Sequence, residues 1–123
     1  MAEVVAINRY AVRDAAGFDR AIAALVERVR TAGHPGVQGY HFYRSAPDEG
    51  RAIVCYADAG AWVGHHDLIM GWPEMAAFRA VADLDEVLLF GPVTAAMQGW
   101  LDRMALGDRV RVMGPVLSGF ARG

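Results

Sequence analysis

The segment 3–12, EVVAINRYAV, constrains the fold more than any other part of this chain, because it has the pattern of a β-strand that is mostly apolar on both faces. Even-numbered and odd-numbered side chains of a strand point to opposite faces. One face carries Val4, Ala6, Asn8, Tyr10 and Val12, and the other carries Val5, Ile7, Arg9 and Ala11. Because apolar surface is stabilised by leaving water, we expect this strand to be covered on both sides.

Helical and strand patterns alternate after this segment. Apolar residues at helical spacing over 18–29 follow Asp14 and predict an amphipathic helix that ends at Gly33. Segments 37–44 and 51–57 predict the two strands of a β-hairpin, joined by the six turn-forming residues SAPDEG. The first half of the chain therefore has the order strand, helix, strand, strand.

Two helices and a fourth strand follow the hairpin. The first helix is expected over about 59–70, with Asp58 as its cap. Proline is favoured at the first position of a helix, so the second helix is expected over 73–82. Segment 85–90, DEVLLF, predicts the next strand.

The expected core covers about residues 3–93 and an extension covers 94–116, within one domain of residues 1–123. Gly91-Pro92 is expected to open a further helix in this part of the chain. The alternating piece 109–113, RVRVM, is compatible with a fifth strand, and the last ten residues are typical of a loose tail.

The order β-α-β-β-α-β predicts an α+β protein with a ferredoxin-like arrangement, in which four antiparallel strands carry two helices on one face, plus a C-terminal helix. Helices on one face leave the other face of the sheet uncovered. With 54% hydrophobic residues, the chain is expected to cover that face with a second sheet, most simply in a symmetric homodimer.

Charge and composition exclude several classes of function. The net charge is −2 and the 12 basic residues are all scattered Arg, so no basic stripe indicates nucleic-acid binding. No apolar run approaches the roughly 18 residues of a membrane span, and the start MAEVVAINRY lacks a signal-peptide pattern, so we expect a cytoplasmic protein. The absence of Lys excludes a Schiff-base lysine, and GxGxxG and GxSxG motifs are missing.

Four stretches of the sequence are similar to one known family. They are AINRY at 6–10, the hairpin end at Ala57-Asp58, the segment AWVGHHDLIMGWPEMAAF at 61–78, and a strand that runs into Gly-Pro-Val at 91–93. Over about 3–93 the chain resembles the dimeric α/β-barrel superfamily, particularly its antibiotic-biosynthesis monooxygenase-like branch. The resemblance implies a two-sheet barrel at a dimer interface and a small pocket in each subunit between sheet and helices.

Members of that superfamily include cofactor-free monooxygenases of quinols and aromatic polyketides, haem-degrading monooxygenases, and proteins without an established activity. The haem-degrading relatives carry an axial His in the helix that here covers 73–82, and the sequence PEMAAFRAVAD contains none. Haem degradation is therefore disfavoured. Because one fold supports many functions, the fold alone does not choose among the others.

Asn8 is the most informative polar residue, because an amide inside an apolar strand is unfavourable unless it is hydrogen-bonded. Its small neighbour Ala6 on the same face leaves room for a ligand. By resemblance, Asn8 matches the Asn that contacts substrate or haem in several family monooxygenases. The alternative is a structural Asn that ties strands together or lies at a bulge.

His65 and His66 are the candidate proton acceptors, and by resemblance His65 best matches the family position that often carries His. Adjacent helical residues point about 100° apart, so the pair cannot hold one metal ion, and we expect one to face inward and the other to face solvent beside Asp67. The four His have no HxH or HxxxH spacing, so no metal site is predicted. The alternative is a surface His or a core His.

Aromatic residues supply the candidate substrate-binding surface. Trp62, Trp72 and Phe78 are expected to enclose an aromatic substrate, with core packing as the alternative for Phe78 and helix stapling for Trp72. His41 and Tyr43 share one face of their strand and are further candidates, although packing at a sheet interface is the favoured interpretation. Two other residues have structural roles: Arg9 is expected in an interface ion pair, and Cys55 as an inert buried thiol.

These residues favour a cofactor-independent monooxygenase acting on a small phenolic, quinol-like or polyketide aromatic substrate. Such substrates form carbanions that react with dioxygen directly, so the protein need only bind them, remove a proton and exclude water. A second hypothesis is a non-catalytic, stress-responsive-type dimer that binds a small apolar ligand. A third is an isomerase or decarboxylase-like enzyme that uses His and Asn for proton transfer.

Overall fold

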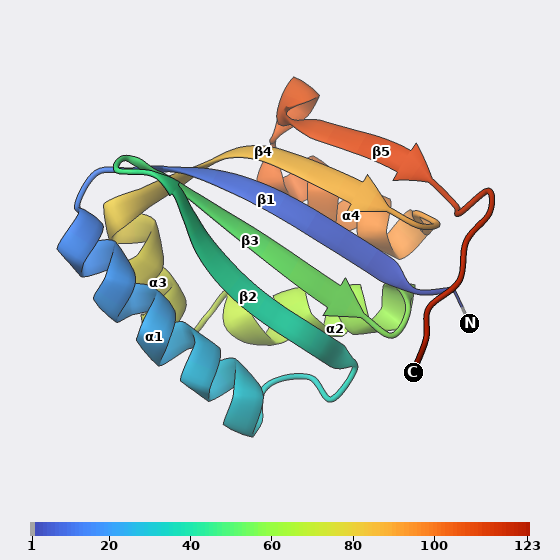
Figure 1. The fold of residues 1–123 in the computed structure, drawn as a ribbon, viewed down its shortest axis with the longest axis horizontal. Coiled ribbons are helices and arrows are strands. Elements are labelled where there is room, and N and C mark those ends of the chain that lie inside the picture. Colours follow the sequence, from blue (N-terminus) through green and yellow to red (C-terminus); the bar gives the residue numbers. More distant parts are fainter. Residues whose placement is uncertain (1) are drawn as a thin grey trace.

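The computed structural model describes residues 2–123, in which one five-stranded sheet carries all the helices on a single face (Figure 1). In chain order the elements are β1 (Val4–Val12), α1 (Ala15–Ala32), β2 (Val37–Ala46), β3 (Glu49–Tyr56), α2 (Ala59–Ile69), α3 (Pro73–Val81), β4 (Ala82–Phe90), α4 (Ala95–Met104), the 3-10 turn η1 (Gly107–Arg109) and β5 (Val110–Gly114). None of the helices in this part of the chain has the length and apolar content needed to cross a membrane.

The strand order β2-β3-β1-β4-β5 confirms the ferredoxin-like α+β fold. β1 is antiparallel to both β3 and β4, and β2 is antiparallel to β3. The fifth strand is present and makes the sheet mixed, because β5 runs parallel to β4. A parallel neighbour requires a crossover connection, which α4 supplies.

Two connections differ from the expected ones. The hairpin loop is shorter than the expected 45–50, because β2 and β3 continue pairing to Ala46 and Glu49. Backbone groups gain more hydrogen bonds in this longer ladder, which leaves Pro47-Asp48 as the turn. β4 begins at Ala82 instead of 85, directly after α3, because Ala82 already pairs with the end of β1.

The last helix starts later than expected. Gly91 has a φ of +120°, which favours glycine and is incompatible with a helix, so Gly91-Pro92 does not open α4. Thr94 caps α4 instead, and its side chain accepts a hydrogen bond from the Met97 backbone N–H at 3.3 Å. The expected cap of α2 is confirmed, since Asp58 accepts from the Ala61 backbone N–H at 2.8 Å.

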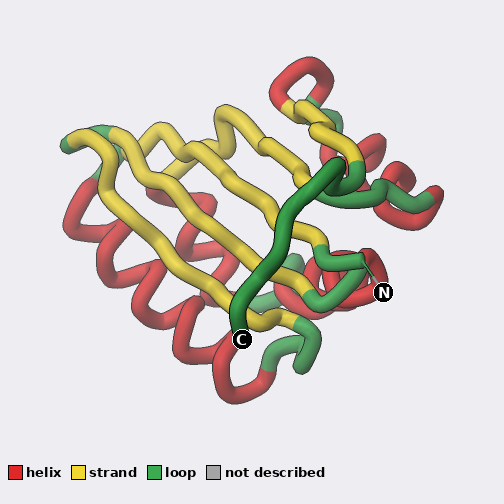
Figure 2. Tube along the Cα trace, turned by 45° about the vertical axis from the view of Figure 1, so that its right-hand side comes forward, coloured by secondary structure: helices red, strands yellow, loops and turns green. Residues whose placement is uncertain are grey.

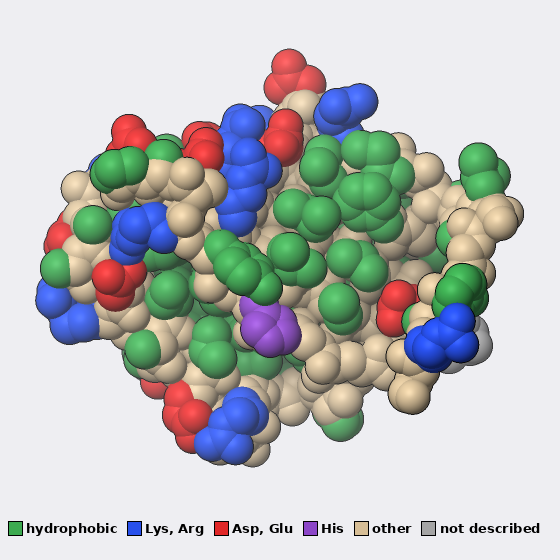
Figure 3. Space-filling model, in the orientation of Figure 1, with side chains coloured by type: hydrophobic (Ala, Val, Ile, Leu, Met, Phe, Trp, Pro, Cys, Tyr) green, Lys and Arg blue, Asp and Glu red, His purple; other side chains and the backbone are tan. Residues whose placement is uncertain are grey.

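The two faces of the sheet have different surroundings. Even-numbered side chains of β1 and β3 point to the helices and are mostly buried, together with Phe18, Leu25 and Phe78 from α1 and α3. Odd-numbered side chains lie on the open face, where Ile7 and Ile53 are half-buried. Figure 3 shows hydrophobic side chains gathered over the middle of this open face, beside a group of basic and acidic side chains.

Arg9 lies on the open face, 3.9 Å from carboxylate oxygens of both Glu49 and Glu86. Cys55 is on the same face and is half-buried, so the expectation of a buried thiol is wrong for the single chain. The reason is that its strand position is odd-numbered and therefore points away from the helices. The residues after Gly114 form no helix or strand, as expected. They lie near the end of the sheet at which β1 begins (Figure 2).

Candidate functional site

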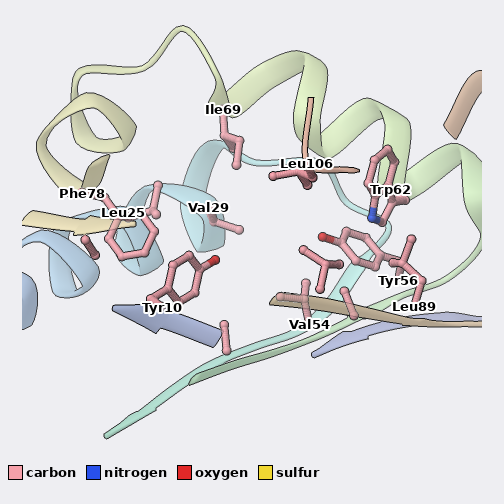
Figure 4. Packing of buried hydrophobic residues seen from close by; sticks show 14 of the residues in the cluster. Tyr10, Leu25, Val29, Val54, Tyr56, Trp62, Ile69, Phe78, Leu89 and Leu106 are labelled. Carbon is pink, nitrogen blue, oxygen red and sulfur yellow. The ribbon is translucent and has the colours of Figure 1, made fainter. Parts of the chain in front are cut away.

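A cavity of about 470 Å³ lies between the helix-facing side of the sheet and the helices α2 and α3. This volume is within the range of small-molecule sites. It is lined by Asn8, Tyr10, Tyr40, Phe42, Ala52, Val54, Tyr56, His65, His66, Ile69, Met70, Met75, Phe78, Arg79, Ala82, Asp83, Leu84, Met104 and Leu106. Figure 4 shows part of this region from close by, with Val54 on the sheet side and Ile69 on the helix side.

Asn8 reaches the cavity from the middle of β1. Its amide Nδ2 donates to the Tyr10 hydroxyl at 3.1 Å, whereas its Oδ1 is buried and has no hydrogen-bond partner among residues 2–123. A buried acceptor without a partner costs roughly 1–3 kcal/mol, so such atoms are rare in stable proteins. The pairing of β1 with β4 shifts its register between Arg9 and Tyr10, so a bulge adjoins Asn8 as well.

His65 is the only buried polar or charged residue of the described chain, with 2% of its surface exposed. Its ring packs edge-on against Tyr40 and Tyr56, at centroid distances of 5.4 and 5.7 Å. Burial, together with the smaller effects of the neighbouring His66 and His34, lowers the pKa of His65 to about 3. The imidazole is therefore neutral at physiological pH, and its Nδ1 has no partner within residues 2–123.

His66 is oriented by its own helix. Its Nδ1 lies 2.7 Å from the carbonyl oxygen of Trp62, so Nδ1 carries the proton that it donates and Nε2 is left as an acceptor. The ring stacks on Trp62 at a centroid distance of 3.9 Å. Burial lowers the pKa of His66 to about 4, although the hydrogen bond to Trp62 and the charge of Asp67 oppose this shift.

The tyrosines of the cavity are neutral donors. Burial raises the pKa of Tyr10 to about 12, against a smaller opposing effect of the hydrogen bond from Asn8. Burial also raises the pKa of Tyr40 and Tyr56. Charged side chains in the lining are limited to Arg79 and Asp83, which come from the end of α3 and the start of β4.

Known structures share this arrangement of elements. MupZ from Pseudomonas fluorescens superposes with a TM-score of 0.76 and 17% identity over 99% of this chain and 96% of that chain. SnoaB, a cofactor-independent oxygenase from Streptomyces nogalater, superposes with a TM-score of 0.64 and 24% identity over 73% of this chain and 92% of that chain. A proposed antibiotic biosynthesis monooxygenase from Caulobacter crescentus superposes with a TM-score of 0.61 and 17% identity over 72% of this chain and 85% of that chain. This chain has the antibiotic-biosynthesis monooxygenase-like fold. The sequence itself matches no protein-family model and no curated protein.

Within this monooxygenase-like fold, Asn8, His65, His66 and Phe78 all reach the cavity. The expectation that one of the two His faces solvent is wrong. The physical reason is α4, which packs beside α2, with the Trp100 indole Nε1 donating to Asp67 Oδ1 at 2.9 Å. The Trp100 ring also lies 5.9 Å from the His66 ring, centroid to centroid, and shields His66, whereas Asp67 stays exposed.

Four other predicted residues lie outside the main cavity. Trp62 is buried behind His66 and lines a smaller adjoining hollow of about 30 Å³. Trp72 precedes α3, and the guanidinium of Arg28 lies 4.3 Å from its ring centre. The structure does not place His41 and Tyr43 in the cavity, because they point to the open face, where Tyr43 is 53% exposed.

Sequence reasoning missed several lining residues. Tyr10 and Tyr56 share the helix-facing side of the sheet with Asn8, and the even-numbered alternation of β1 was a usable signal for Tyr10. Tyr40 and Phe42 occupy the cavity-facing side of β2 in place of their neighbours His41 and Tyr43. Met104 and Leu106 come from the C-terminal extension, for which the sequence indicated no role in a site.

Proposed function

We propose that this protein is a cofactor-independent monooxygenase that oxidises a small phenolic, quinol-like or polyketide aromatic substrate in the cavity beneath α2. The observation that carries the proposal is the neutral, buried imidazole of His65, whose Nδ1 has no partner in residues 2–123. The unpartnered Asn8 Oδ1 in the same lining adds to it. The shared fold with SnoaB, which is a cofactor-independent oxygenase, supports the same reaction class.

The chemistry requires proton removal and access of dioxygen. The substrate loses a proton from an acidified C–H or O–H to His65 and becomes a delocalised carbanion. This carbanion gives electrons to dioxygen and a C–O bond forms. The peroxide anion takes the proton back from His65. The resulting hydroperoxide then loses water, which takes the remaining hydrogen of the same carbon, to leave a carbonyl. One oxygen atom therefore enters the product and the other leaves as water.

His65 with a pKa of about 3 is a weak base toward water. A substrate anion beside the imidazolium opposes the effect of burial, because an opposite charge at close range favours the charged form. Proton transfer to His65 is therefore favourable only when the substrate anion that it produces stays beside the imidazolium inside the cavity. Asn8 and Tyr10, which are joined by their 3.1 Å hydrogen bond, would hold the substrate in place for this transfer.

Oxygen uptake tests the proposal. Purified protein without added flavin or metal is given dithranol or menadiol, and consumption of oxygen above the buffer rate is expected. His65→Ala combined with Asn8→Ala should lower the rate at least about 100-fold, which is the usual scale of general base catalysis. Gln98→Ala, on the exposed side of α4, serves as the control that retains the rate. Wild-type turnover at the background rate, or full turnover in the double variant, would refute the proposal.

A non-catalytic binding protein is the second candidate, and the low pKa of His65 favours it, because efficient general bases have a pKa near the working pH. Under this hypothesis small aromatic ligands raise the melting temperature without consumption of oxygen. The same pair of measurements therefore separates the two functions.

We also propose that two copies pair through their open sheet faces. The half-buried Ile7 and Ile53 lie at paired positions in the middle of that face. Light scattering is expected to give twice the chain mass for the wild type. Ile53→Glu should give a folded monomer, since it places a charge in the apolar contact. A wild-type monomer at all concentrations would refute the pairing.

A further inference from the structure

Two tyrosine hydroxyls face one another across the cavity. Figure 4 shows the hydroxyls of Tyr10, from β1, and Tyr56, from β3, pointing toward each other from opposite sides. Both side chains line the cavity and are deeply buried, with 8% and 2% of their surfaces exposed. Neither hydroxyl accepts the proton that goes to His65 in the reaction proposed above, where Tyr10 only helps to hold the substrate.

The Tyr10 hydroxyl is oriented by its neighbours. It accepts a hydrogen bond from Asn8 Nδ2 at 3.1 Å, so its own proton is free to be donated elsewhere. The Tyr10 ring packs edge-on against Phe78 at a centroid distance of 4.9 Å, which restricts its rotation. The hydroxyl is thus a pre-positioned donor at the edge of the cavity.

Tyr56 lines the cavity from β3, with 2% of its surface exposed. Its ring is held against His65 at a centroid distance of 5.7 Å. A buried tyrosine hydroxyl is normally hydrogen-bonded. A tyrosine hydroxyl that faces a cavity is therefore placed to donate to an acceptor on a ligand.

Most of the surface between the two hydroxyls is apolar, and Asn8 is its polar member beside Tyr10. Val54 forms the sheet side, and Ile69 and Leu106 lie on the helix side (Figure 4). The apolar walls favour a flat hydrocarbon body in the middle of the ligand.

We propose that Tyr10 and Tyr56 act as opposed hydrogen-bond donors that select an aromatic ligand with an acceptor oxygen at each end. The inference rests on the proposed function only in using the same cavity. It adds the identity of the residues that bind the two oxygens and the requirement for two such oxygens. Because burial raises the pKa of both tyrosines, both hydroxyls keep their protons at physiological pH.

Binding of an unreactive probe tests this pair without turnover. The probe is 2,3-dimethyl-1,4-naphthoquinone, which has two opposed carbonyl oxygens and no free ring position for addition of a thiol. Its matched comparison is 2,3-dimethylnaphthalene, which lacks both oxygens. The variants are Tyr10→Phe and Tyr56→Phe, which remove only a hydroxyl, and Tyr43→Phe on the open face is the control for that change.

Each cavity variant is expected to weaken quinone binding about 5- to 10-fold and to leave binding of the hydrocarbon unchanged, since one hydrogen bond is lost. Infrared difference spectra should show both carbonyl stretches lowered in the wild type. In each variant one stretch should return to its free frequency. A structural role for the hydroxyls would instead weaken both probes equally and leave the stretches unmoved.

Three results would overturn the proposal: equal losses for both probes, carbonyl stretches that match those of the quinone in water, or no binding of the quinone to the wild type. Failure of the proposed function is a different outcome, in which the quinone binds as described and no quinol consumes oxygen. Persisting oxygen uptake with unshifted carbonyl stretches would refute the tyrosine pair alone.

Discussion

The imidazoles of His65 and His66 make folding sensitive to mild acid, and His65→Gln tests this directly. The folded protein holds His65 and His66 neutral, with pKa values lowered by burial to about 3 and about 4. In the unfolded chain both take an ordinary pKa of about 6.5. As the pH falls below about 6.5, protons bind the unfolded chain first and draw the equilibrium toward it. The stability that these groups contribute is therefore full above this pH and is lost progressively down to their folded pKa values.

The magnitude follows from the unfolded chain. Between about pH 7 and pH 5 the folded state stays neutral at both positions, so each imidazole lowers the free energy of unfolding by about 2 kcal/mol. The two together account for about 4 kcal/mol, a large part of the 5–15 kcal/mol that typical domains possess. His65→Gln removes one titrating group, so its loss over this interval should be about 2 kcal/mol smaller than that of the wild type.

Urea unfolding followed by tryptophan fluorescence at both pH values measures the difference. Comparing pH-dependent losses, not absolute stabilities, removes the cost of the substitution itself. His66→Gln should reduce the loss by a similar amount, since its folded pKa is also below 5. A His65→Gln protein with the same pH dependence as the wild type would refute the conclusion that His65 is buried and neutral.

Three further changes test the packing around the site. Gly50→Ala places a methyl group 2.5 Å from Cζ of Phe18, so calorimetry should show a loss of about 1–3 kcal/mol, and an unchanged melting temperature would contradict this contact. Asp58→Ala removes the cap of α2 and should cost about 1 kcal/mol in urea unfolding, with no loss expected if the cap is unimportant. Asp67→Ala removes the acceptor of the Trp100 indole, so hydrogen exchange of α4 should accelerate, and equal exchange would show that this bond does not hold the helix.

Much of the fold could be predicted because its signals are local. Strand alternation, helical spacing and the cap at Asp58 depend on neighbours a few residues away, and these expectations are confirmed in β1, β3, α1 and α2. The same alternation correctly placed Asn8 on one face of β1 with Val4, Ala6, Tyr10 and Val12. Boundaries at the hairpin and at β4 differed, because strand pairing with distant residues extends both elements.

The candidate site could be predicted only in part. The spacing of apolar residues along a strand or helix tells which residues share a face, but it does not tell which face is covered by other elements. On β2 both faces carry aromatic rings, so the sequence could not choose the face with Tyr40 and Phe42 over the face with His41 and Tyr43 for the cavity. In the same way, the enclosure of His66 depends on α4, more than 30 residues further along the chain.

The sequence by itself determined the order of the elements, the apolar character of both faces of β1, and the presence of Asn8 in a strand and of two adjacent His in a helix. Only the tertiary structure decided that both His line the cavity and that Tyr10 and Tyr56 face each other across it. The physical reason is that residues far apart in sequence meet through packing of whole elements. Burial, and with it the neutral state of His65, is a property of those contacts and not of any segment alone.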